Sequence, residues 1–332
     1  MNFRIKLIGL CLLVMFFLSN SKANSAHIVG GEMTYRCLGS NQYEVTLTLF
    51  RDCSPGRVGF SNTARFYYFQ GNTGIRLSRP YIPLATSFII PINTVSSCLI
   101  VPPGNCLEQA IYIDTISLPP TSNGYDVSYR VGNRTNVSIN MFNTNVPIIL
   151  TTRIPPNDTI CNNSPTFNSF PPTILCVNDP INIDYSATDA DGDSLVYDFF
   201  TPYFSSFGIG LTAPPYIPIN WAGGFNQNSQ VTASPALQID NVTGLITGTP
   251  TGLGTYITGV TVKEYRNGIL INETRRDFLL TIVNCFPTSA AVSTAGVICN
   301  SFTVNFGNSS AATPTTTFLW DFGDTSTLAD TS

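Results

Sequence analysis

The stretch Tyr43-Glu44-Val45-Thr46-Leu47-Thr48-Leu49-Phe50 alternates polar and apolar side chains from Glu44 to Leu49. Because successive side chains of a β-strand point to opposite faces, this period of two predicts a strand with one buried and one exposed face. The same alternation recurs in short runs bounded by Gly, Pro, Asn or Asp, at 125–131, 137–141, 181–185, 260–262 and 302–306. No convincing helical stripe of ten residues accompanies them. The sequence therefore predicts an all-β protein built from antiparallel β-sandwiches of the Ig-like kind.

The composition supports this fold class and narrows the functions. Charged residues make up only 11% of the chain, against roughly a quarter in ordinary globular proteins. Thr, Ser, Asn, Gly and Pro take their place, which suits sandwiches with polar faces and many turns. Lys263 is the only lysine after residue 23, so the chain lacks the clustered cations that nucleic-acid binding requires.

The N-terminus predicts a secretory signal peptide over residues 1–23. Arg4 and Lys6 precede an apolar run at 7–18, which is too short to span a bilayer, and Ser21-Lys22-Ala23 offers a small-residue cleavage site. Cleavage after Ala23 removes three cations and no acid, which takes the formal net charge from −4 to −7. No later apolar stretch is long enough for a membrane helix. We therefore expect a secreted or cell-surface protein without membrane insertion in this segment.

Eight cysteines remain after this cleavage, and an even number in an exported chain predicts disulfides. Proximity in sequence suggests Cys37–Cys53, Cys98–Cys106, Cys161–Cys176 and Cys285–Cys299. Pairing of Cys176 with Cys285 would tie the first and last strands of one domain equally well. The connectivity stays open on sequence alone.

Turn-rich segments divide the chain into expected domains. The run at 153–158 interrupts the strand rhythm and suggests a linker, and the run at 284–287 closes the next unit. The prediction is a signal peptide at 1–23, a first β-sandwich at 24–155, a second at 156–285 and the start of a truncated domain at 286–332.

The run Asp189-Ala190-Asp191-Gly192-Asp193-Ser194-Leu195 is the candidate site. Carboxylates at every second position could converge on Ca²⁺, completed by a distant residue such as Asp277 or Glu264. The twelfth residue of the run is Phe200 and not the Glu that an EF-hand needs. The competing interpretation is a solvated Asp/Gly turn held by side-chain-to-backbone hydrogen bonds. Both interpretations stay open.

An enzyme is not predicted. Gly192-Asp193-Ser194-Leu195 matches the nucleophile block of a family of esterases, but the only histidine of the chain, His27, lies far upstream and leaves the serine without a base. Paired carboxylates for glycoside hydrolysis are the other route. Glu264 and Arg266 lie on the same side of a strand, as do Glu273 and Arg275, which suggests cross-strand charge pairs instead.

Two groups of motifs carry a family resemblance. The run Phe318-Leu319-Trp320-Asp321-Phe322-Gly323-Asp324 resembles the signature of PKD domains, and the segments at 187–197 and 243–256 resemble cadherin-like modules of bacterial surface proteins. Together with the segments at 30–35, 43–53 and 262–278, the chain is similar to the N-terminal half of large surface proteins of gliding Bacteroidetes. The resemblance implies an adhesin-like protein exported through the type IX route.

We therefore predict a non-catalytic extracellular scaffold or adhesin segment whose partners are surface glycans or other extracellular proteins. The alternative is a carbohydrate-binding accessory module of a polysaccharide-processing system. Aromatic residues between 203 and 225 could form a sugar platform, with Trp221 as its candidate stacking residue. Large aromatic side chains are more often buried, so a core role for Trp221 is the competing interpretation.

Overall fold

The computed structural model describes residues 27–77, 81–91, 99–100, 105–133, 138–142, 146–170, 172, 174–205, 211–287, 292–293 and 307–309. Within these ranges the regular structure consists of β-strands and turns, and no residue lies in a helix. The prediction of an all-β protein with antiparallel sheets is confirmed. The predicted signal peptide and the PKD-like run that contains Trp320 lie outside the described residues.

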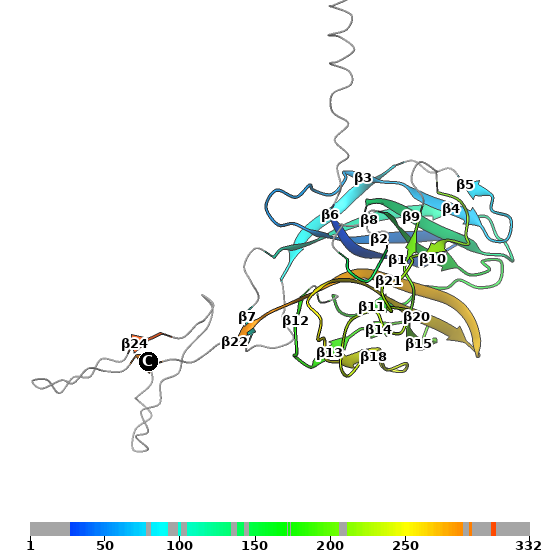
Figure 1. The fold of residues 1–332 in the computed structure, drawn as a ribbon. Coiled ribbons are helices and arrows are strands. Elements are labelled where there is room, and N and C mark those ends of the chain that lie inside the picture. The colour runs from blue at the N-terminus through cyan, green and yellow to red at the C-terminus, as the bar shows by residue number, and fades with distance from the viewer. Residues whose placement is uncertain are drawn as a thin grey trace, which may run out of the picture.

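A nine-stranded sheet runs through the molecule (Figure 1). Its order is β15 (Ser194–Phe199), β20 (Gly254–Arg266), β21 (Ile269–Val283), β1 (Ile28–Gly39), β2 (Gln42–Asp52), β8 (Leu107–Ser117), β6 (Ile82–Ile90) and β3 (Thr63–Ala64), with β12 (Ile174–Cys176) parallel to β21. The other pairings are antiparallel. This one sheet includes strands from both predicted sandwich domains.

The junction between the two parts is the pairing of β1 with β21, where Gly30 to Glu32 lie opposite Phe278 to Arg276. A side chain at Gly30 would not fit, because a Cβ atom there would lie 2.2 Å from the carbonyl oxygen of Asp277. The glycine therefore lets the first and last long strands approach to hydrogen-bonding distance.

A second sheet covers the N-terminal part of the first one. Its order is β17 (Ile217–Pro218), β16 (Tyr203–Phe204), β10 (Pro147–Ile154), β9 (Tyr125–Asn133), β4 (Phe66–Gln70) and β5 (Arg76–Leu77). The alternating apolar residues of the two sheets meet in one core that includes Leu47, Tyr68, Val127 and Leu150. This sandwich follows from the period-two pattern of the sequence.

A separate core lies under the C-terminal part of the large sheet. Strands β13 (Ile181–Asp184), β19 (Leu245–Gly248) and β18 (Gln238–Ile239) form the facing sheet. Tyr256, Val260 and Val262 of β20 pack here against Ile183 and Ile246. The long β20–β21 hairpin turns at Asn267-Gly268, where both residues have positive φ, as a tight two-residue hairpin turn requires.

Short pairs complete the description. They are β11 (Thr166–Phe167) with β14 (Ala187–Thr188), β22 (Phe286–Pro287) with β7 (Leu99–Ile100), and β23 (Val292–Ser293) with β24 (Gly307–Asn308). The predicted strand at 137–141 is wrong for its described part, since Ser138 and Met141 form only isolated bridges. The predicted run at 302–306 lies outside the described residues.

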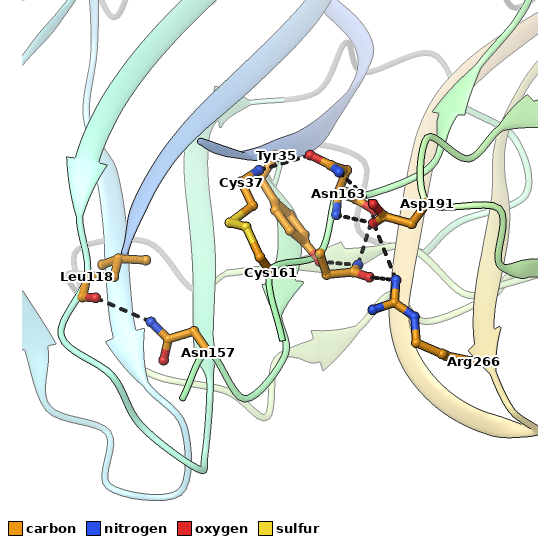
Figure 2. Close-up of a disulfide and its surroundings, with 9 residues drawn as sticks. Tyr35, Cys37, Leu118, Asn157, Cys161, Asn163, Asp191 and Arg266 are labelled. Atoms are coloured by element: carbon orange, nitrogen blue, oxygen red, sulfur yellow. Dashed lines mark hydrogen bonds and ion pairs between the residues drawn. A yellow bond between two sulfur atoms is a disulfide. The ribbon is translucent and has the colours of Figure 1, made fainter. Parts of the chain in front are cut away.

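The segment predicted as a linker is packed against the connection between β8 and β9. Asn157 is buried, its backbone N–H donates to the carbonyl of Thr121 at 3.1 Å, and its side-chain oxygen accepts from the N–H of Thr121 at 2.8 Å. The side-chain amide of Asn157 also donates to the carbonyl of Leu118 at 3.3 Å (Figure 2). These contacts fix the chain where it leaves β10.

Candidate metal site

The acidic loop connects β14 to β15 and curls around Asp189. One carboxylate oxygen of Asp189, Oδ1, accepts hydrogen bonds from the backbone N–H groups of Asp191 at 3.0 Å and Asp193 at 2.9 Å. Gly192 has a φ of 80°, a conformation that favours glycine. These are the hydrogen bonds expected of an Asp/Gly turn, and they leave the second oxygen of Asp189, Oδ2, pointing away from the backbone donors.

A fourth carboxylate joins this loop from the end of β20. Ser194 lies opposite Tyr265, so the residue that precedes β15 is brought close to Glu264 and Arg266. The side chains of Asp189, Asp191, Asp193 and Glu264 each offer an oxygen within 4.8 Å of the others. This group of four carboxylates could bind a metal ion.

Several oxygen atoms of this group are buried without a hydrogen-bond donor among the described residues. They are Oδ2 of Asp189, both carboxylate oxygens of Glu264, and Oδ1 of Asn272. Glu264 and Asn272 lie directly opposite each other on β20 and β21 and are 0% and 1% exposed. A buried acceptor without a partner costs about 1–3 kcal/mol, and more if it is charged. A cation bound among these oxygen atoms would give them the partner that they lack.

The surroundings change the acidity of these groups in different directions. Burial raises the pKa of Glu264 to about 8. The side-chain amides of Asn162 and Asn272 lower it, and the neighbouring Asp193 and Asp189 raise it. Burial also raises the pKa of Asp189. The pKa of Asp193 is lowered, chiefly because the guanidinium of Arg266 donates hydrogen bonds to it. The ionised form is therefore disfavoured at Glu264 and Asp189 and favoured at Asp193, which binds Arg266.

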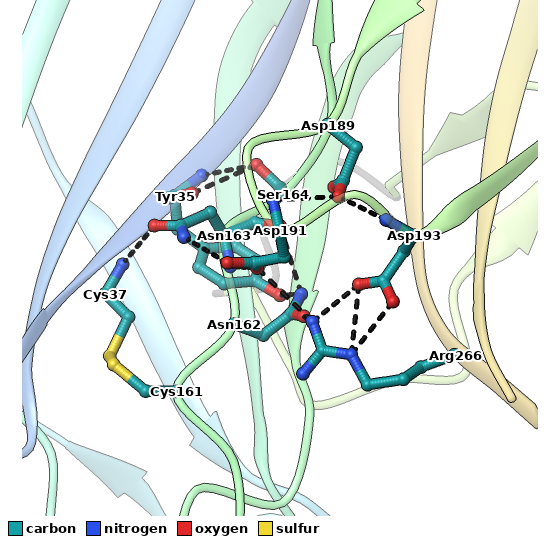
Figure 3. Close-up of polar contacts among 10 residues, drawn as sticks. All are labelled: Tyr35, Cys37, Cys161, Asn162, Asn163, Ser164, Asp189, Asp191, Asp193 and Arg266. Atoms are coloured by element: carbon teal, nitrogen blue, oxygen red, sulfur yellow. Dashed lines mark hydrogen bonds and ion pairs between the residues drawn. A yellow bond between two sulfur atoms is a disulfide. The ribbon is translucent and has the colours of Figure 1, made fainter.

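Arg266 holds the opposite side of the group (Figure 3). Its Nε atom donates to Oδ1 of Asp193 at 2.9 Å, and its Nη2 atom lies 3.4 Å from Oδ2 of Asp191 and donates to Oδ1 of Asn162 at 2.7 Å. The backbone N–H and the side-chain amide of Asn163 donate to the two carboxylate oxygens of Asp191 at 2.7 and 2.9 Å. Asp191 and Asp193 are thus oriented by backbone, amide and guanidinium donors, whereas Oδ2 of Asp189 has no donor among the described residues.

A disulfide holds the segment at 161–164 in this position. Cys37 on β1 is bonded to Cys161 (Figure 2). Beyond it, the backbone N–H of Cys37 donates to Oδ1 of Asn163 at 3.0 Å, and the N–H of Tyr35 donates to the hydroxyl of Ser164 at 2.8 Å. The buried amide of Asn162 donates to the hydroxyl of Tyr35 at 2.9 Å. The cross-link therefore connects the acidic loop to the N-terminal strand.

Among the cysteines that the structure describes, the other disulfides are Cys53–Cys106 and Cys176–Cys285. The pairings suggested by proximity in sequence, Cys37–Cys53, Cys98–Cys106, Cys161–Cys176 and Cys285–Cys299, are wrong, because each has a member bonded elsewhere. The alternative pairing of Cys176 with Cys285 is the one present. Cys98 and Cys299 lie outside the described residues.

Asp277 does not belong to the acidic group. It lies opposite Gly259 on β20, five residues before Glu264, which at about 3.3 Å per residue places it about 16 Å along the strand. Glu264, the other distant residue considered, is the one that joins. Of the residues expected in cross-strand charge pairs, Arg266 binds Asp193 and Asp191 beside β15, whereas Glu273 pairs with Arg275 on its own strand.

Trp221 is a partly buried residue. Its ring packs beside Met141, Val146 and Ile219, and its Nε1–H donates to the hydroxyl of Thr201 at 3.2 Å. This environment favours the core interpretation over an exposed stacking platform.

Asn162, Asn163 and Asn272 were not expected at the site. Asparagine side chains are uncharged, so they form no recognisable ligand pattern in the sequence. Only the tertiary fold brings these three residues to the acidic loop. Glu264 could have been singled out, because it continues the inward alternation of Val260 and Val262.

Comparison with family models, curated proteins and solved structures gave no match.

Within the described residues, no helix has the length and apolarity that crossing a bilayer requires. The three disulfides indicate an oxidising compartment outside the cytoplasm.

Proposed function

We propose that this chain is a non-catalytic, extracellular segment of scaffold or adhesin type, in which Ca²⁺ stiffens the acidic loop. The observation that carries the proposal is the locking of β1 to β21 in one sheet, together with disulfides that span 124 and 109 residues. Such cross-links limit local opening in an environment that contains proteases. The predicted signal peptide and the resemblance to surface proteins of gliding Bacteroidetes support export and surface placement, with Ig-like sandwiches that share the large sheet.

The donor set fits Ca²⁺ in particular. Ca²⁺ takes about six to eight oxygen ligands and accepts irregular geometry. The unpartnered oxygens of Asp189, Glu264 and Asn272, with the carboxylates of Asp191 and Asp193, offer oxygen atoms only. Zn²⁺ and copper prefer nitrogen or sulfur ligands, which the group lacks. Bound Ca²⁺ would neutralise Glu264 and tie β20 to the loop before β15.

A thermal melt of the chelator-treated, disulfide-bonded protein tests the calcium proposal. Saturating Ca²⁺, at about 100 times its Kd, is expected to raise the Tm by about 3–6 °C, and Mg²⁺ is expected to do less. Asp189→Asn and Glu264→Gln should each abolish the Ca²⁺ shift. Asp240→Asn, in a similar but fully exposed turn, is the matched control and should retain it. No Ca²⁺-dependent shift in the parent protein would leave only a structural turn.

The scaffold proposal has its own test in limited proteolysis. A rigid segment held by disulfides is expected to yield one protease-resistant fragment that includes residues 27–287 under oxidising conditions. After reduction of the disulfides, we expect the protease to degrade it. Cleavage into two stable halves near residue 155 would contradict it.

A further inference from the structure

A cleft of about 460 Å³ lies between the second sheet and the β20–β21 hairpin. It contains none of the four carboxylates of the acidic group, although Asn272 borders both. Its walls include Asp126 and Arg153 on β9 and β10, Glu273 and Arg275 on β21, and the two tyrosines Tyr203 and Tyr216. Its volume falls within the roughly 300–1,000 Å³ of small-ligand sites.

Two tyrosine rings form one wall of this cleft. The ring centroids of Tyr203 and Tyr216 are 5.9 Å apart, and both side chains are half-buried. The hydroxyl of Tyr216 shares a hydrogen bond with the hydroxyl of Ser128, which holds the ring before any ligand arrives. Pro214 and Pro215 continue the apolar surface beside it. A rigid aromatic and proline wall suits the flat apolar face of a ring-shaped ligand.

Charged groups of both signs form the other wall. Arg153 lies 3.3 Å from Asp126, and Arg275 forms an ion pair with Glu273. The guanidinium carbon of Arg275 also lies 5.5 Å from the centroid of the Tyr203 ring. Each pair keeps partly exposed atoms, since Arg153 is 45% and Glu273 is 25% exposed. Carboxylates and guanidinium groups held in this way can accept from and donate to hydroxyl groups.

The alternation of β21 explains how one strand serves two environments. Thr274 and Arg276 are buried on the face of β21 toward the core that contains Phe167 and Val262. Glu273 and Arg275 lie on the opposite face and line the cleft. Polar residues at the cleft-facing positions keep this face open to a polar ligand.

We propose that this cleft binds a neutral oligosaccharide of about two or three sugar rings. Sugar rings combine an apolar face, which the ring of Tyr216 would stack on, with hydroxyl groups, which Asp126, Arg153 and Glu273 would bind. The two cations and two anions of the wall balance each other, which disfavours a phosphate-bearing or polyanionic ligand. The proposal goes beyond a scaffold function and does not depend on Ca²⁺.

Isothermal titration of the disulfide-bonded protein, in chelator, tests this binding. The probes are neutral trisaccharides of β-1,4-linked glucose, β-1,4-linked xylose and α-1,4-linked glucose, with a trisaccharide of galacturonic acid and a proline-rich decapeptide for comparison. We expect at least one neutral trisaccharide to bind with a Kd of about 1 mM or tighter. Tyr216→Ala and Glu273→Gln should each weaken that binding by about tenfold or more, since either change removes a ring stack or a charged hydrogen-bond acceptor.

Matched controls separate the cleft from the rest of the surface. Tyr81→Ala removes a tyrosine that is 65% exposed and outside the cleft, and it should leave the Kd unchanged. Trp221→Ala should also leave it unchanged if the protein remains folded by circular dichroism. Failure of every neutral trisaccharide, binding of the decapeptide alone, or equal loss in Tyr81→Ala would overturn the proposal. None of these results would alter a Ca²⁺-dependent melting shift, so the two proposals fail separately.

Discussion

The guanidinium of Arg276 on β21 makes a two-point ion pair with the carboxylate of Glu32 on β1, at 2.6 Å and 3.0 Å. The two residues are 244 positions apart in sequence and directly opposite in the sheet. The side chains are only 3% and 9% exposed. Arg276 also donates to the carbonyl of Ser169 at 2.7 Å and lies 4.0 Å from the centroid of the Phe167 ring. The ion pair therefore joins β1 to the C-terminal core, which contains Phe167.

Removal of one member of this pair should be costly. Arg276→Ala is expected to lower the free energy of unfolding by about 3–5 kcal/mol, because it leaves Glu32 buried without a partner. The double change Glu32→Leu with Arg276→Met should cost less than Arg276→Ala alone. Arg36→Ala, which breaks an exposed pair with Glu44, should cost at most about 1 kcal/mol. Urea denaturation measures all three, and equal costs for Arg276→Ala and Arg36→Ala would contradict a buried linking role.

Glu264 should make the metal-free protein less stable as the pH rises. Its pKa is about 8 in the folded protein, against an ordinary value of 4.5. A carboxyl group with a raised pKa stabilises the fold fully below the unfolded value, and this contribution is lost as the pH rises toward the folded value. Between pH 4.5 and 8 we expect a loss of at most about 5 kcal/mol.

Comparison with Glu264→Gln isolates this contribution, since the other titrating groups are common to both proteins. The variant should show a flatter dependence of stability on pH in chelator. Added Ca²⁺ should flatten the dependence of the parent protein, because binding requires the ionised carboxylate. Superimposable pH profiles of parent and variant would rule out a protonated Glu264.

Gly30 should be intolerant of a side chain. In Gly30→Ala the new methyl group would meet the backbone of Asp277, so we expect a loss of at least about 2 kcal/mol in urea denaturation. Gly132→Ala is the matched control, because Gly132 also lies in a strand and a Cβ atom there has nothing within 4 Å. Similar stability of the two variants would mean that β1 and β21 can separate without cost.

The Cys37–Cys161 disulfide should matter for the acidic group as well as for stability. Replacement of both cysteines by serine is expected to cost about 2–4 kcal/mol and to weaken the Ca²⁺-dependent melting shift, since Asn163 would no longer be held against Asp191. The paired replacement of Cys53 and Cys106 should cost a similar amount and leave the Ca²⁺ shift intact. Equal Ca²⁺ shifts in both variants would show that the acidic loop does not depend on the cross-link.

The local part of the structure was predictable from the sequence. The alternation at 43–50 and 125–131 gives β2 and β9, and the Asp189–Asp193 run forms the expected turn. These features depend on residues close in sequence, whose periodicity and hydrogen-bonding preferences are visible directly.

The long-range part was not predictable in the same way. Cys37 pairs with Cys161 and not with Cys53, because the sheet brings distant segments together while neighbouring cysteines lie on different strands or loops. The same holds for Asn272, and for the choice between Glu264 and Asp277, which only the register of β20, β21 and β15 decides. Sequence spacing contains no information on such partners.

The pairing of β1 with β21 has a consequence for how the chain reaches its native state. During synthesis the N-terminal strand emerges more than 200 residues before its partner, so one edge of β1 and the carboxylate of Glu32 lack their native partners until β21 has been made. Long-range pairing of this kind slows folding, and an unpaired strand edge invites association with other chains. A chain with this topology therefore stays open to such association until β21 pairs with β1.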